Sequence, residues 1–175
     1  MEKKDRPYSV MPYNKEWAKK YKQEQKIIAG IFGDVAVSIE HIGSTSVEGM
    51  WAKPQIDILV IVNDLYLVDS LISKMETEGY TYQEDFNKYD ERYFTRDADS
   101  GERLVSVHVT KQDNREAQSH IYLRDYLRVH PQERELYSKV KREAYESGAN
   151  LAEYPSKKKE VLLELLEKAK KWAGK

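Results

Sequence analysis

Residues 39–46 read Ile39-Glu-His-Ile-Gly-Ser-Thr-Ser46, and residues 53–62 read Lys53-Pro-Gln-Ile-Asp-Ile-Leu-Val-Ile-Val62. The first stretch completes a β-branched, partly alternating run that starts at Val35, a pattern typical of a strand that leads into a turn of small residues. The second is almost entirely apolar after Gln55, as expected of a central strand that is covered on both faces. Its one charged residue after Lys53 is Asp57.

The turn after the first strand has the composition of a phosphate-binding loop. Gly43 and the hydroxyl residues that follow it are small, so their backbone N–H groups can approach a phosphate closely while the hydroxyls add donors. The charge of Asp57 is costly in a buried strand unless a metal, a cation or a hydrogen-bond donor compensates it. Lys53 and a Mg²⁺ ion are candidate partners. The alternative is that Asp57, near the start of its strand, faces solvent or caps a turn.

The segments on either side of this centre carry alternating helix and strand signals. Apolar residues at helical spacing predict one helix from Asn14 to Gly33 and a second from Asp64 to Gly79. Strands are expected at 91–96 and 103–110, joined by a turn at 97–101. From His120 onward the pattern is helical, with the expected helices at about 121–129, from 131 to about 147, and at about 156–172.

This order of elements predicts the fold class, which is α+β, or mixed α/β, with a central mixed sheet flanked by helices. The sequence has no internal repeat and no linker rich in proline or glycine, so we expect a single domain over residues 1–175. Within it, the sheet core is expected at about 13–119 and a C-terminal helical extension at about 120–173.

The composition excludes several classes of protein. The chain has 29 Lys plus Arg against 30 Asp plus Glu, a net charge of -1, which disfavours a general binder of nucleic acid or of anionic membranes. Without cysteine, a disulfide framework, a thiolate metal site and a cysteine nucleophile are all impossible. The first residues lack the apolar core of a signal peptide, and no stretch is apolar enough to span a membrane. We therefore expect a cytoplasmic protein and leave its oligomeric state open.

Several motifs resemble the signature of the GrpB-like family, a branch of the nucleotidyltransferase superfamily. The first two are His41-Ile-Gly-Ser-Thr-Ser-Val47 with Gly49, and Lys53-Pro-Gln-Ile-Asp-Ile58. They are followed, in the family's order, by Val107-His-Val109, Arg124-Asp-Tyr-Leu-Arg128 with His130-Pro131, and Tyr154 with Lys158. The likeness extends from about Tyr13 to Trp172. Two residues depart from it: Glu48 replaces the usual proline, and Gln55 replaces the usual aliphatic residue.

The resemblance implies a nucleotidyltransferase-like fold and a divalent-metal centre. In the superfamily, a Gly-Ser turn precedes a strand with Asp-x-Asp, whose carboxylates share one face and hold ions that bridge the phosphates of a nucleotide. Here Asp57 takes the first position, but Leu59 takes the second, and the third carboxylate would fall near His108. The implied catalytic residues are Asp57, His108 and His41, with Asp57 and His108 as ligands of Mg²⁺ or Mn²⁺. Imidazole suits Mn²⁺ or Zn²⁺ better than Mg²⁺.

Strand alternation limits which residues of the first strand reach this site. Glu40 and His41 point to opposite faces of a regular strand, so only one of them faces the site. We favour His41 because it belongs to the family motif; Glu40 would supply a carboxylate if a bulge turned it inward. The alternative for each histidine is a hydrogen-bonded structural role.

The candidate phosphate-binding residues are small or cationic. They are Gly43, Ser44, Thr45, Ser46, Lys53, Arg92, Arg124 and Lys158, with Arg96 and Arg128 as further cations. Arginine offers a bidentate fork and lysine a point charge, although the default role of any single cation is a solvated or paired surface position. We expect a small cationic cleft beside Ser44 and Asp57 in an otherwise neutral molecule, sized for one phosphorylated ligand.

Three functions are consistent with these residues. The first is metal-dependent transfer of a nucleotidyl group from a nucleoside triphosphate to a small acceptor, and Leu59 argues against it. The second is a catalytically weakened domain that binds a nucleotide, another phosphorylated metabolite or a coenzyme A-like ligand; the resemblance adds that the family's domain occurs fused to dephospho-coenzyme A kinase. The third is an interaction protein that uses its amphipathic C-terminal helices.

Overall fold

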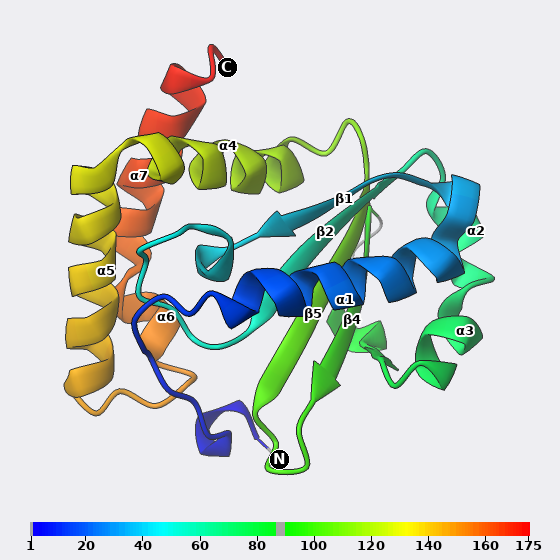
Figure 1. Ribbon diagram of the computed structural model, residues 1–175, viewed down its shortest axis with the longest axis horizontal. Helices are drawn as coiled ribbons and strands as arrows, with labels where there is room; N and C mark the ends of the chain where they lie inside the picture. Colours follow the sequence, from blue (N-terminus) through cyan, green and yellow to red (C-terminus); the bar gives the residue numbers. More distant parts are fainter. Residues whose placement is uncertain (1, 87–89) are drawn as a thin grey trace.

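The computed structural model describes residues 2–86 and 90–175, which contain a five-stranded mixed sheet with helices on both faces (Figure 1). The strand order is β1-β2-β5-β4-β3. The strands span Ala36–Ile42 (β1), Ile56–Val62 (β2), Thr81–Tyr82 (β3), Glu91–Asp97 (β4) and Arg103–Lys111 (β5). Only the β2–β5 pair is parallel among these pairings. The mixed α/β architecture predicted from the sequence is confirmed.

One face of the sheet carries the main core beneath α1 (Glu16–Phe32). The side chains of the even-numbered residues of β2 and of the valines of β5 point toward this helix and pack with its residues Trp17, Ile28 and Phe32. The helix begins and ends as predicted, because the Asn14 side chain accepts a hydrogen bond from the Glu16 N–H at 2.9 Å and Gly33 takes a positive φ of 49° just beyond the last turn.

The helix expected from Asp64 to Gly79 is two short helices, α2 (Leu65–Asp69) and α3 (Ile72–Thr77). Asp64 caps α2 as predicted, since its side chain accepts a hydrogen bond from the Tyr66 N–H at 2.9 Å. At the break, the Ser70 hydroxyl donates to the Leu67 carbonyl at 2.7 Å, a local bond of the kind that competes with the helical ladder. The predicted apolar stripe of Val68, Leu71 and Met75 is nevertheless buried in the main core.

The other face and one end of the sheet carry the C-terminal helices (Figure 1). These are α4 (Arg115–Val129), α5 (Pro131–Glu146), α6 (Tyr154–Lys157) and α7 (Lys159–Trp172). The first begins earlier than expected, because the Asn114 side chain accepts a hydrogen bond from the Ala117 N–H at 3.0 Å. Ala117 packs with Ile42, Leu59 and Ile61, so α4 rests directly on the sheet.

The pairing of the central strands places two predicted site residues on the α4 face. Asp57 pairs with Ser106 and Leu59 with His108 across the parallel ladder. Because side chains alternate along each strand, Asp57, Ser106 and His108 point to the same side as Leu59, away from α1. No helix in the described part of the chain combines the length and apolar character needed to cross a membrane.

Candidate functional site

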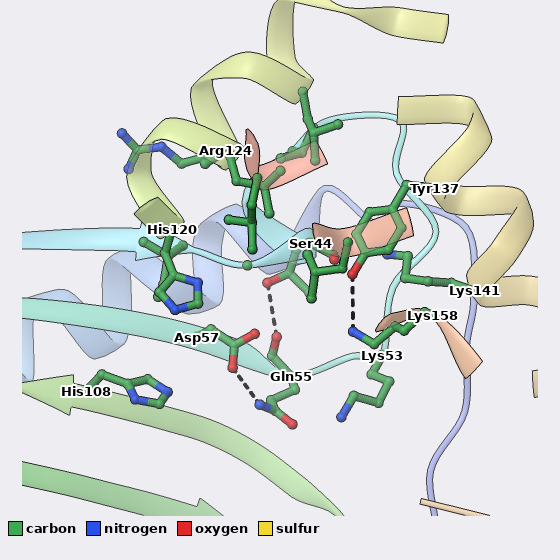
Figure 2. Close-up of a pocket in the computed structure, with 18 of the residues that line it drawn as sticks. Ser44, Lys53, Gln55, Asp57, His108, His120, Arg124, Tyr137, Lys141 and Lys158 are labelled. Carbon is green, nitrogen blue, oxygen red and sulfur yellow. Dashed lines mark hydrogen bonds between the residues drawn. The ribbon is translucent and has the colours of Figure 1, made fainter. Parts of the chain in front are cut away.

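A cavity of about 280 Å³ lies between the α4 face of the sheet and the C-terminal helices. Its polar and aromatic lining comes from the turn after β1, from β2 and β5, and from α4 to the start of α7 (Figure 2). The polar and aromatic lining residues are Ser44, Thr45, Lys53, Gln55, Asp57, His108, His120, Arg124, Tyr137, Lys141, Tyr154 and Lys158. Of the predicted site residues, the structure therefore brings Gly43, Ser44, Thr45, Lys53, Asp57, His108, Arg124 and Lys158 to one cavity.

Asp57 lies against the turn that follows β1. Gly43 has a φ of 71°, and a Cβ atom at this position would collide with the Asp57 carboxylate, so only glycine fits here. The amide of Gln55 donates to Asp57 Oδ1 at 2.5 Å and to Ser106 Oγ at 3.1 Å. A side-chain amide is thus the hydrogen-bond donor that holds this partly buried carboxylate.

The turn itself is fixed by its hydroxyl groups. Thr45 donates to the Gln55 carbonyl at 3.0 Å, and Ser46 donates to the Gly43 carbonyl at 2.5 Å. Ser46 is buried and lines the opposite side of the turn, so its predicted phosphate contact has no support from its position. Gly43, Ser44 and Thr45 remain at the cavity wall.

Three lysines and two tyrosines form the end of the cavity between α5, α6 and α7. Lys141 Nζ lies 5.0 Å from the centre of the Tyr137 ring, and Lys158 Nζ lies 5.7 Å from the same centre. The Tyr154 ring has Lys158 Nζ at 5.4 Å and Lys53 Nζ at 5.9 Å. Lys158 also donates to the Tyr137 hydroxyl at 3.3 Å. We call these five residues the lysine–tyrosine cluster.

Lys141 is the most buried cation of the cluster. Its side chain is 2% exposed, and among residues 2–86 and 90–175 its Nζ atom and the Tyr154 hydroxyl are the buried polar side-chain atoms without a hydrogen-bond partner. Burial, reinforced by the charges of Lys158 and Lys53, holds the pKa of Lys141 well below its ordinary value, while Asp57 acts in the opposite direction. Burial also lowers the pKa of Lys158, again opposed by Asp57.

Two histidines lie on the other side of Asp57 from the lysines (Figure 2). His108 Nδ1 is 2.6 Å from Glu91 Oε1, which leaves Nε2 as the second ring nitrogen for a ligand. His120 lines the cavity from α4, and although the residue is exposed to solvent, partial desolvation of its ring and the charge of His108 lower its pKa, while Asp57 opposes that shift. The cavity therefore has cations at one end and imidazoles at the other, and aliphatic side chains such as Leu123, Leu162 and Leu166 complete its lining.

Sequence reasoning missed His120, Tyr137 and Lys141. The signal for the last two was present, because Tyr137, Lys141 and Ala144 lie at helical spacing on the buried face of α5. A lysine on an otherwise buried helical stripe is unusual and points to a special environment. His120 shares a helical face with Leu123, Arg124 and Leu127, which all line the cavity.

His41 does not reach this cavity. It pairs with Ile58 while Ile42 pairs with Asp57, so it points to the α1 face, where its ring stacks on Tyr21 with centroids 4.5 Å apart. Its Nε2 lies 3.1 Å from Thr45 Oγ1, and burial, followed by the charges of Arg128 and Arg124, lowers its pKa to about 4. As predicted, Glu40 and His41 point to opposite faces of the sheet. Glu40 is on the face that carries the cavity, so the prediction that His41 faces the site is wrong.

The predicted arginines are held by carboxylates and carbonyls. Arg92 forms a bidentate pair with Asp69 of α2 at 2.6 and 3.0 Å, outside the cavity. Arg124 lines the cavity, but its guanidinium binds Glu40 at 2.8 Å, Asp125 at 2.8 Å and the His41 carbonyl at 3.1 Å. Arg128 donates to the Ser46 carbonyl at 2.8 Å. The positive charge directed at the cavity therefore comes mainly from lysines, and the expected phosphate contact of Arg92 lacks geometric support.

The donors around Asp57 do not fit the predicted divalent-metal centre. Leu59, in the second carboxylate position, is 1% exposed and packs in an apolar cluster with Ile42 and Ile61. One Asp57 oxygen already accepts a hydrogen bond from Gln55. Within the described ranges, no group of three or more histidine, aspartate or glutamate side chains is arranged to hold a metal ion.

The chain is similar to proteins of one family. A family model described as GrpB protein matches residues 7–168. The UPF0157 protein YqkA of Bacillus subtilis is 32% identical over 168 residues, which cover 95% of this chain and 48% of YqkA. The UPF0157 protein BH1888 of Halalkalibacterium halodurans is 30% identical over 162 residues, which cover 92% of this chain and 82% of BH1888. This chain thus spans about half the length of YqkA and most of BH1888.

Solved structures show the same relationship. The crystal structure of conserved protein GrpB from Enterococcus faecalis matches with a TM-score of 0.82 and 32% identity, over 91% of this chain and 98% of that one. A cytoplasmic RNA terminal U-transferase matches with a TM-score of 0.55 and 12% identity, over 75% of this chain and 41% of that one. The second likeness shows the fold alone, which is nucleotidyltransferase-like as predicted. By its sequence and its structure, this chain belongs to the GrpB family.

Proposed function

We propose that this chain binds a nucleotide, or another small molecule with phosphate groups, in the cavity between the sheet and the C-terminal helices. The observation that carries the proposal is the meeting of Lys53, Lys141 and Lys158 with the Gly43–Ser44 turn at one cavity of about 280 Å³. Ammonium groups and small-residue turns are the groups with which proteins bind phosphate oxygens. The volume is close to the lower end of the range for small-molecule sites.

The two ends of the cavity suit the two ends of a nucleotide. The lysine–tyrosine cluster offers positive charge and donors for phosphates. Asp57 and the imidazoles of His108 and His120 offer acceptors and donors for hydroxyl and amine groups (Figure 2). A carboxylate repels phosphate, so the ligand's uncharged part belongs beside Asp57 and its phosphates belong beside the lysines.

Binding is tested by thermal shift and titration calorimetry with the four ribonucleoside triphosphates and coenzyme A, because a ligand that binds the folded state raises the melting temperature. We expect Lys158→Gln to weaken binding about tenfold, or about 1.4 kcal/mol. The matched control is Lys157→Gln, which removes the same charge from an exposed neighbour. If no phosphate-bearing ligand stabilises the protein, or if both variants bind like the wild type, the proposal is wrong.

Nucleotidyl transfer is a second candidate, favoured by the nucleotidyltransferase-like fold and by Asp57 beside the glycine turn. In this reaction the oxygen of an acceptor hydroxyl bonds to the α-phosphorus, the bond from that phosphorus to the bridging oxygen breaks, and diphosphate leaves. His108 Nε2, opposite the ring nitrogen that contacts Glu91, would take the hydroxyl proton.

Transfer is followed with a triphosphate labelled at the α-phosphate, in the presence of Mg²⁺, of Mn²⁺ or of a chelator. We expect Asp57→Asn to retain binding and to lose transfer of the label. Equal transfer by Asp57→Asn and the wild type would contradict a role for Asp57. Binding of the triphosphate without transfer of the label would support the binding function and exclude nucleotidyl transfer.

A further inference from the structure

The lysine–tyrosine cluster has the composition of a subsite for a chain of phosphates. Its ammonium groups come from three parts of the chain: Lys53 precedes β2, Lys141 lies on α5, and Lys158 lies between α6 and α7. All three ammonium groups lie near the rings of Tyr137 and Tyr154, and Lys158 Nζ is within 6 Å of both ring centres. Protonated amines this close repel one another, so the arrangement favours a bound polyanion that neutralises their charge.

Two buried polar atoms of the cluster without hydrogen-bond partners indicate what kind of ligand it would bind. Lys141 Nζ and the Tyr154 hydroxyl both belong to the cluster, and within the described ranges neither has a hydrogen-bond partner. A buried donor without a partner lowers stability, and the loss is recovered when an acceptor arrives. Phosphate oxygens are acceptors only, and a phosphate chain presents several of them at short intervals.

The same region is unfavourable for a divalent cation. The three lysines surround the end of the cavity where ligand phosphates would lie. Their positive charges make the binding of a metal cation there less favourable. Asp57 is the carboxylate whose charge acts on Lys141 and Lys158, and its Oδ1 is held by Gln55. The side chain two residues further along β2 is the apolar Leu59.

We infer that Lys53, Lys141 and Lys158 bind at least two adjacent phosphate groups of the ligand directly and take the place of a divalent cation. This inference rests on the proposed function and names its substrate class: nucleoside diphosphates and triphosphates rather than monophosphates. Free oligophosphate shares the same chemistry. Lys141 contacts the phosphates through its Nζ atom, and the Tyr154 hydroxyl donates to a phosphate oxygen.

Ligand binding is expected to be coupled to proton uptake at Lys141. The groups that face its amine are the cations Lys53 and Lys158, the carboxylate of Asp57, and the phenols Tyr137 and Tyr154. Burial and the two cations hold the pKa of Lys141 below its ordinary value in the free protein. Phosphate charges act in the opposite sense, so the pKa of Lys141 rises on binding, and at a pH between its free and bound values a proton is taken up.

The test is titration calorimetry of the full chain with ADP, AMP and inorganic triphosphate, each in a chelator and again in excess Mg²⁺. We expect ADP to bind in the chelator with a Kd within about threefold of its value in Mg²⁺, and at least about tenfold more tightly than AMP. Inorganic triphosphate that competes with ADP would place both on the same subsite. Buffers of different ionisation enthalpy report the number of protons taken up.

Two variants assign the effect to the cluster. Lys141→Met and Lys158→Gln should each weaken ADP binding about tenfold or more, and Lys141→Met should also remove the proton uptake. The matched control, Lys139→Met, changes an exposed lysine of the same helix and should bind like the wild type. Unfolding curves establish that each variant is folded.

The outcomes separate this inference from the proposed function. Binding that disappears in the chelator, equal affinities for AMP and ADP, or wild-type affinity of both cluster variants would overturn the inference and leave the proposed nucleotide binding in place. Failure of every phosphate ligand to bind, with or without Mg²⁺, would overturn both.

Discussion

Replacing Lys141 by methionine should stabilise the protein in the absence of ligand. The lysine side chain is 2% exposed, and its amine has no hydrogen-bond partner among the described residues. Leaving such a donor buried and unsatisfied costs about 1–3 kcal/mol. Methionine has a similar unbranched stem, so little apolar burial is lost, and the contact of the amine with the Tyr137 ring at 5.0 Å offsets about 0.5–1 kcal/mol of the gain.

The net effect is a rise of up to about 2.5 kcal/mol in the free energy of unfolding, equivalent to a melting temperature up to about 10 °C higher for a chain of this size. Urea unfolding at pH 7 measures it, with Lys139→Met as the control. The pH dependence supplies a second check, because the folded-state pKa of Lys141 lies below its unfolded value. The unfolded chain then binds the extra proton, so the wild type loses stability as pH falls from about 10.5 toward the folded-state pKa.

In Lys141→Met this loss of stability toward lower pH should be smaller, with a remaining slope from Lys158, whose pKa burial also lowers. The reasoning would be refuted if the variant were less stable than the wild type at pH 7 while Lys139→Met was unchanged. That result would mean that the amine has a stabilising partner in the free protein.

Three further predictions concern the turn and the buried histidine. Gly43→Ala should lower the free energy of unfolding by about 2 kcal/mol or more, because alanine is strained at a positive φ and its Cβ would collide with Asp57. Urea unfolding measures this loss. The loss should be smaller for the control Gly148→Ala, where φ is 78° and no atom lies within 4 Å of the added Cβ. His41 has a pKa of about 4, below its unfolded value, so its contribution to stability is lost as pH falls from 6.5 through 4, by up to about 3 kcal/mol; in His41→Gln, thermal melts should show a shallower slope over that range. Gln55→Leu removes the amide that donates to Asp57 Oδ1 and Ser106 Oγ, so it should lower the free energy of unfolding by about 1.5–3 kcal/mol. Urea unfolding measures the loss, and unchanged stability would contradict a role of this amide in holding the carboxylate.

Local patterns were enough to predict much of the fold. The first helix, the apolar strand β2 and the half-polar strand β5 all lie within a few residues of their predicted bounds. The helix has helical spacing and capping residues, β2 is a continuous apolar run, and β5 alternates. The helix after Asp64 was expected to be continuous, and a local serine bond interrupts it. The start of α4 was missed because its cap, Asn114, precedes a polar first turn.

The site was only partly predictable, because its composition depends on contacts between distant segments. The turn, Asp57 and Lys158 were found from motif residues that do lie at the cavity. The face on which His41 lies depends on its pairing with Ile58, and β1 has a register shift between Ala36 and Ser38 that a regular alternation does not include. The sequence also did not reveal which cations are paired with carboxylates. Arg92, for example, pairs with Asp69, which lies 23 positions away.

The most direct test of phosphate binding by the lysine–tyrosine cluster is a crystal structure of the protein with a non-hydrolysable nucleoside triphosphate analogue. We expect phosphate oxygens within hydrogen-bond distance, about 2.7–3.2 Å, of the Nζ atoms of Lys53, Lys141 and Lys158, with the nucleoside toward Asp57 and His108. Phosphates bound instead on the other side of the Gly43–Ser46 turn, beside His41 and Arg128, would contradict this account of the site.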